Sequence, residues 1–121
     1  MKSVVAFVAA VALCSVVLAD GAKPVEVWEC KDFVSPGPVL VTAMVESNRD
    51  TGNITVAGVT QATVFNVAGF NRRWDFGLLS DGTYKYAFVI EPNGDGEYFD
   101  FGREKNAHPS SLMKCRQTVK R

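Results

Sequence analysis

The stretch RRWDFGLLSDGTYKYAFVIEPNGDGEYFDF, residues 72–101, decides the fold of this chain. Apolar and polar side chains alternate along it, and two glycine-containing turns, residues 80–82 and 93–96, interrupt the alternation. A period of two is typical of a strand with one buried face, and asparagine, aspartate and glycine tolerate the positive φ angles of tight hairpins. The stretch therefore predicts three consecutive antiparallel strands.

The same pattern extends on both sides of this stretch. Turn signals at 35–38, 48–52 and 102–110 separate further alternating segments, without a helical periodicity of useful length after residue 19. The strands expected from the sequence cover residues 25–33, 39–47, 53–57, 62–68, 72–78 and 84–90, a segment through 99–101, and a last strand after residue 110. We predict an all-β domain of seven to eight antiparallel strands, either a small β-sandwich or a filled β-barrel.

Residues 1–19, MKSVVAFVAAVALCSVVLA, have the pattern of a secretory signal peptide. Lys2 precedes an apolar run that ends in the small-residue cleavage pattern Val17-Leu18-Ala19. Cleavage before Asp20 leaves a single domain, residues 20–121, near the lower end of the sizes that bury a substantial core. We expect this domain to be secreted, extracellular and free of the membrane after cleavage.

Two cysteines remain in the mature chain, because Cys14 leaves with the signal peptide. In an oxidising compartment a lone pair predicts one disulfide, here Cys30 to Cys115, between the first and the last strand. Two free thiols or intermolecular pairing are the alternatives. A zinc site is not expected, since these cysteines and the single His108 would lack a fourth ligand.

The charge of the chain is balanced, with 13 basic and 13 acidic residues. Such a balance predicts no binding to nucleic acid or to an anionic membrane. The segment Glu91–Gly96 has oxygen-bearing side chains at alternate positions, as calcium loops do, but it starts with glutamate and has Gly102 at the twelfth position. We expect a plain hairpin there, and a monomeric protein that needs neither metal nor cofactor.

Candidate catalytic groups are few. Asp75 and Asp100 lie in two similar motifs, Trp74-Asp75-Phe76-Gly77 and Phe99-Asp100-Phe101-Gly102, and His108 stands beside serines in a loop. Two adjacent carboxylates could perform acid–base chemistry, but nothing in the sequence brings these two together. We expect no catalytic residue, and a hydrolase remains the least favoured alternative.

Aromatic side chains are concentrated in the second half of the chain, on positions that alternation assigns to the interior. These residues are Trp74, Phe76, Tyr84, Tyr86, Phe88, Phe99 and Phe101. They could line a cavity for an apolar ligand or simply fill the core. A small domain is expected to need them for its core, because a cavity forfeits packing contacts.

The sequence therefore predicts a secreted, non-enzymatic binding module that contacts an extracellular protein or small molecule through its surface loops. The loops available are residues 35–38, 48–53, 93–96 and 102–110. The alternative is a small lipocalin-like carrier of an apolar ligand. The triplet Asn53-Ile54-Thr55 is a candidate for N-glycosylation in a eukaryotic host.

Overall fold

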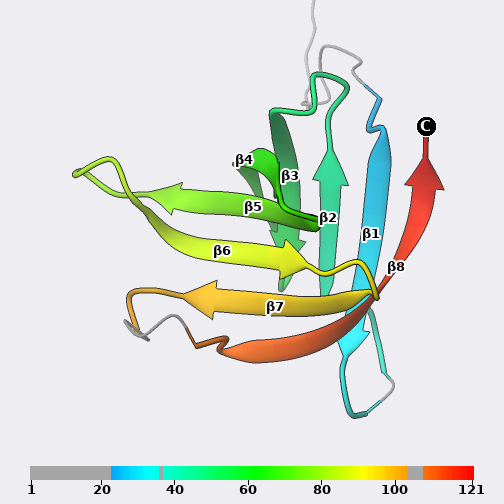
Figure 1. Cartoon of the computed structure of the whole chain (residues 1–121). Coiled ribbons are helices and arrows are strands. Elements are labelled where there is room, and N and C mark those ends of the chain that lie inside the picture. Colours follow the sequence, from blue (N-terminus) through cyan, green and yellow to red (C-terminus); the bar gives the residue numbers. More distant parts are fainter. Residues whose placement is uncertain (1–22, 36, 104–107) are drawn as a thin grey trace, which may run out of the picture.

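The part of the chain that the structure describes folds into eight β-strands that close into one barrel (Figure 1). The computed structural model describes residues 23–35, 37–103 and 108–121, so the expected signal peptide, residues 1–19, lies outside the described residues. The strands are β1 (Glu26–Asp32), β2 (Val41–Val45), β3 (Thr51–Val56), β4 (Val59–Ala68), β5 (Asn71–Leu78), β6 (Tyr84–Ile90), β7 (Asp95–Asp100) and β8 (Ser111–Lys120). The all-β prediction is confirmed, and the architecture is the barrel and not the sandwich.

Each strand pairs antiparallel with the next one, and β8 returns to pair with β1. The ten-residue strands β4 and β8 each pair with one neighbour along their first part and with the other along their last part. In β4, residues 59–64 pair with β3 and residues 64–68 with β5. In β8, residues 111–114 pair with β7 and residues 113–120 with β1. In Figure 1, β1 to β3 run steeply and β5 to β7 cross them. The long strands thus connect two groups of strands with different directions.

Apolar side chains that alternate with polar ones in the sequence lie on the inner face of the barrel, and the residues between them lie on the outer face. In β2, Val41, Ala43 and Val45 are buried, while the residues between them are half-buried on the outer face. The β6–β7 turn follows the predicted hairpin: Gly94 has a φ of 93°, and Asn93 Oδ1 accepts a hydrogen bond of 3.0 Å from the Asp95 backbone nitrogen. Local sequence therefore determines both the burial of the strands and the position of this turn.

The predicted disulfide is confirmed. Cys30 and Cys115 are direct partners in the pairing of β1 with β8, and their sulfurs are bonded. β1 and β8 are the pair of strands that closes the barrel (Figure 1), so the bond joins the first strand to the last.

Candidate functional site

The interior of the barrel is filled by aromatic side chains. Trp74 and Phe88 have no exposed surface, and Phe76 is 1% exposed. The Trp74 ring lies 5.0 Å from that of Phe65 and 6.1 Å from that of Phe88, and its indole nitrogen donates a hydrogen bond of 2.9 Å to the Met44 carbonyl. Three of the side chains considered as ligand-lining residues therefore pack against other rings in the core.

Tyr84 and Tyr86 lie at the start of β6, before Phe88, and are half-buried. Tyr86 stacks on Phe76 with ring centroids 5.2 Å apart, and it also faces Tyr98 of β7 at 6.0 Å. Burial raises the pKa of the Tyr98 hydroxyl, with smaller contributions from nearby groups. Tyr98 therefore belongs to the interior cluster, although the sequence interpretation did not include it.

The inward orientation expected for Phe99 and Phe101 is wrong. Tyr98 is the register partner of the buried Phe88, whereas Phe99 pairs with Ala87 on the opposite face of the sheet. Phe99 and Phe101 stack on each other with centroids 5.7 Å apart and are not part of the core cluster. Hydrophobicity favours Phe99 and Phe101 as the inner face, but the close approach of β7 to the disulfide requires that Gly96, and with it Tyr98, point inward.

Gly96 is the residue of β7 whose position in the sequence indicates this register. A Cβ at Gly96 would lie 2.6 Å from Cys115 Sγ and 3.2 Å from the Phe88 ring. Glycine inside a strand often marks such a close approach. Because Gly96 and Tyr98 are two residues apart in β7, they share a face of the strand, and Gly96 therefore indicates that Tyr98 lies inside.

The candidate acid–base residues have separate local partners. Asp75 accepts hydrogen bonds from Arg73 Nε at 3.0 and 3.2 Å, and Asp100 accepts one of 3.0 Å from the Gly102 backbone nitrogen. His108 lines a surface hollow of about 320 Å³ together with Arg103, Pro109 and Ser110. Asp75 in β5 and Asp100 at the end of β7 are thus each engaged with a different residue, and β6 lies between the two strands.

An ion pair lies at the end of the Glu91–Gly96 segment, where β7 begins with Asp95. Lys114 binds the Asp95 carboxylate, and this hydrogen bond lowers the pKa of Asp95. Burial raises the pKa of the nearby Glu97, and Glu91 raises it further. In residues 23–35, 37–103 and 108–121, no group of three or more histidine, cysteine, aspartate or glutamate side chains is arranged to hold a metal ion.

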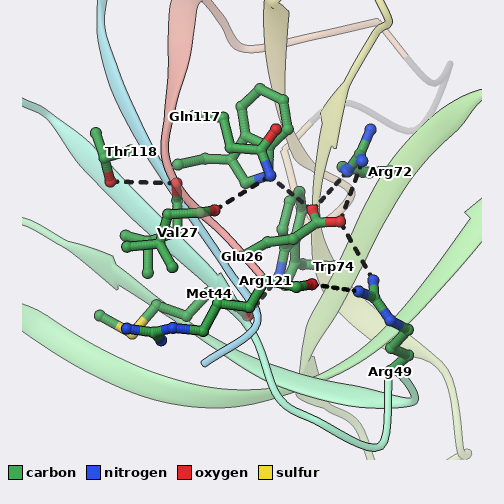
Figure 2. A network of polar contacts seen from close by, with 11 residues as sticks. Glu26, Val27, Met44, Arg49, Arg72, Trp74, Gln117, Thr118 and Arg121 are labelled. Carbon is green, nitrogen blue, oxygen red and sulfur yellow. Dashed lines mark hydrogen bonds and ion pairs between the residues drawn. The ribbon is translucent and has the colours of Figure 1, made fainter. Parts of the chain in front are cut away.

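A buried carboxylate with three donors closes one end of the barrel, and the sequence interpretation did not anticipate it. Glu26, 6% exposed, accepts hydrogen bonds from Arg72 Nε at 2.6 Å and Nη2 at 3.1 Å (Figure 2). Trp28 Nε1 donates to the same carboxylate at 2.9 Å, and Arg49 Nη1 at 3.3 Å. Glu26 and Arg72 precede alternating inward residues that are apolar, Trp28 and Cys30 in β1 and Trp74 and Phe76 in β5, and this alternation is the signal that the sequence offers.

The electrostatics of this cluster favour the charged form of Glu26. Burial by itself raises the pKa of Glu26, but the hydrogen bonds from Arg72, Trp28 and Arg49 outweigh it and hold the pKa below its ordinary value. The Arg72 guanidinium also lies 5.0 Å from the centroid of the Trp28 ring. Because every oxygen of Glu26 is occupied within the protein, the cluster fits a structural role.

The other end of the barrel exposes apolar side chains around the β1–β2 loop. We call these residues the apolar rim: Phe33, Val34, Val39, Leu40 and Leu112. Val34 is 83% exposed and Phe33 47%. The Phe33 backbone nitrogen donates to the Leu112 carbonyl, and that of Leu40 to the Cys30 carbonyl, so β1 and β8 hold the two ends of the loop.

Two surface hollows adjoin the apolar rim. One, of about 350 Å³, contains Phe33 and Val34 and is flanked by charged residues of both signs: Glu29, Asp32, Lys31, Lys114 and Arg116. The other, of about 310 Å³, is lined by Val39, Leu40, the β3–β4 turn and residues of β2, β3 and β8, among them Thr42 and Thr55. The Lys114 ammonium lies 5.6 Å from the Phe33 ring centroid. The rim therefore offers exposed apolar area with concave surface on both sides, as binding sites do.

Of the loops expected to bind, residues 35–38 fall within the β1–β2 connection, which carries this rim. Asn53, the glycosylation candidate, lies within β3 and not in the preceding turn, and it is half-buried. Of the four loops, the structure thus shows exposed apolar side chains around residues 35–38, and strand pairing places Leu112 beside them.

Comparisons with protein families, with curated proteins and with solved structures found no match. Within the part of the chain that the structure describes, there is no helix with the length and apolar character needed to cross a membrane.

Proposed function

We propose that this protein is a secreted, non-enzymatic binding module that contacts an apolar group of an extracellular protein or small molecule through the apolar rim. The observation that carries the proposal is the exposure of Val34 and Phe33 beside a hollow of about 350 Å³. Small soluble domains rarely keep large apolar side chains clustered in water, and such clusters mark interaction surfaces.

The filled interior supports external binding over transport in the barrel. Trp74 and Phe88 are completely buried against other rings. A carrier would have to open this packing to admit a ligand, and such contacts are worth a great deal: truncation of one buried ring to alanine costs about 3 to 5 kcal/mol. Binding at the rim needs no such rearrangement.

Secretion is supported by the signal-like pattern of residues 1–19 and by the bonded cysteines. Disulfides form and persist in oxidising compartments. A domain closed by such a bond presents its loops on a stable frame, which limits the entropy lost when the rim binds.

The proposal is tested with N-phenyl-1-naphthylamine, an uncharged apolar probe that fluoresces more strongly when it leaves water. Val34→Ser and Phe33→Ser should weaken its binding severalfold without changing the unfolding midpoint, because both side chains are exposed. Phe70→Ser is the matched control: Phe70 is 84% exposed, close to the 83% of Val34, but it lies in the β4–β5 turn.

Equal losses in the Phe70→Ser and Val34→Ser variants would contradict a specific role for the rim. Unchanged binding in both rim variants, combined with a loss in Tyr86→Leu, would favour the carrier. Tyr86 is chosen because it is half-buried at the edge of the aromatic cluster.

A further inference from the structure

The outer face formed by β2, β3 and β4 carries no charge. Residues 33–45 and 51–71 contain no Asp, Glu, Lys, Arg or His, whereas every other strand of the barrel has charged side chains. The positions that alternate with the buried ones make up this charge-free face: Thr42, Met44, Thr51, Asn53, Thr55, Thr60, Ala62 and Val64. An uncharged face on a small extracellular protein is a site of contact or of modification.

Asn53 lies in the middle of this charge-free face. In the strand register it stands between Met44 of β2 and Ala62 of β4, and the three strands lie side by side in Figure 1. Its neighbours in β3, Gly52 and Ile54, are buried on the inner face, so Asn53 is directed outward. The flanking side chains leave room, because Ala62 is small and exposed.

The side-chain oxygen of Asn53 is not engaged by the fold. It is buried without a hydrogen-bond partner. The nitrogen is the atom to which an N-linked sugar is attached. Thr55, the third residue of the sequon, lies on the same outer face, and its hydroxyl is within 2.7 Å of that of Thr60.

We infer that Asn53 is N-glycosylated during export and that the sugar covers the charge-free face. In this reaction Asn53 Nδ2 forms a bond to the anomeric carbon of an oligosaccharide held on a lipid diphosphate. The bond between that carbon and the diphosphate oxygen breaks, the lipid diphosphate leaves with the bonding electrons, and the amide gives up one proton. The half-burial of Asn53 in a central strand places the attachment before the barrel closes.

The sugar supplies what the face lacks. A bulky hydrated group at the centre of the β2–β3–β4 face keeps two copies from packing there, a role that charged side chains perform on the rest of the barrel. This inference goes beyond binding at the apolar rim, because Asn53 lines neither of the two hollows beside the rim.

The test uses the full chain expressed in secreting eukaryotic cells, with both cells and medium analysed by mass spectrometry. We expect the protein to carry a sugar that an amidase for N-linked oligosaccharides removes, converting Asn53 to aspartate. Asn53→Gln and Thr55→Ala should each abolish the modification, whereas Thr55→Ser should retain it. Asn66→Gln is the matched control, since Asn66 is exposed on β4 but is followed by Val67-Ala68 and has no sequon.

An unmodified Asn53 in the wild-type protein, whether secreted or retained, would overturn the inference. A separate measurement tests whether the sugar covers the charge-free face and prevents association. In sedimentation equilibrium the sugar-free Thr55→Ala protein should show an average mass that rises with concentration, and the glycosylated Thr55→Ser protein should not. Identical behaviour of these two proteins would overturn the covering role. Binding of the apolar probe should be the same in the wild type and in Asn53→Gln, because Asn53 lines neither hollow beside the rim, and this separates the result from the proposed function.

Discussion

At the scale of single residues, Glu26 and Arg72 show how a polar pair can sit at the end of an apolar barrel. The pair satisfies its own hydrogen bonds: Glu26 has Arg72, Trp28 and Arg49 as donors, and Arg72 also lies over the Trp28 ring. A buried ion pair costs solvation, so its removal as a pair is far cheaper than the removal of one partner.

Arg72→Met should therefore destabilise the protein strongly, by about 3 to 5 kcal/mol, because it leaves the Glu26 carboxylate buried without its main partner. The double variant Glu26→Gln with Arg72→Met should recover much of this loss. Denaturant unfolding of the wild type, both single variants and the double variant measures the coupling. Strictly additive losses would show that the two side chains do not interact.

The same carboxylate predicts a dependence of stability on pH. The folded-state pKa of Glu26 lies below its ordinary value of 4.5. Its contribution to the free energy of unfolding is therefore fully present above that value and is lost as the pH falls through the folded-state pKa.

Comparison with Glu26→Gln isolates this contribution from those of other carboxylates. The difference in unfolding free energy between the two proteins should be largest near neutral pH and should shrink below pH 4.5, the ordinary pKa of Glu26. A constant difference down to strongly acidic pH would contradict the ionised state of Glu26 in this cluster.

At the scale of the elements, β7 shows where sequence pattern alone is insufficient. The apolar residues Phe99 and Phe101 favour one register, and the contact of Gly96 with the disulfide requires the other. A shift by one residue exchanges the two faces of a strand, so a single close contact decides the orientation of all six residues of β7.

Gly96→Ala should cost roughly 1 to 3 kcal/mol, the range for overpacking a core, because its methyl group would lie 2.6 Å from Cys115 Sγ. Gly37→Ala is the matched control: the nearest atom to its Cβ, the Ser35 carbonyl oxygen, is 3.9 Å away. Thermal unfolding of both variants decides this point, and equal midpoints would argue against the tight approach of β7 to the disulfide.

The register also predicts a contrast between two phenylalanines. Phe88→Ala should cost about 3 to 5 kcal/mol because its ring is completely buried. Phe99→Ala should cost clearly less, since Phe99 stacks on Phe101 outside the core cluster. Equilibrium unfolding of both variants tests the contrast, and a larger loss for Phe99 would restore the register expected from hydrophobicity.

At the scale of the whole molecule, the sequence predicted the all-β class, the strand from Tyr84 to Ile90 and the pairing of Cys30 with Cys115. These features depend on local alternation, turn residues and cysteine number. The closed barrel and the Glu26 cluster depend on contacts between distant residues, such as Glu26 and Arg72, which one sequence does not reveal. The apolar rim also depends on contacts between distant residues, because Leu112 lies beside Phe33 only through the pairing of β8 with β1.

The proposed function places binding at the apolar rim of a filled barrel. A titration of ¹⁵N-labelled protein with N-phenyl-1-naphthylamine, followed by two-dimensional nuclear magnetic resonance, tests whether the ligand binds there. The protein has two tryptophans, and the indole of Trp74 is buried in the centre of the core. We expect the backbone signals of Phe33, Val34 and Leu112 to shift while the Trp74 indole signal stays in place. A saturable shift of the Trp74 indole with an unchanged rim would contradict the claim and show that the ligand enters the barrel.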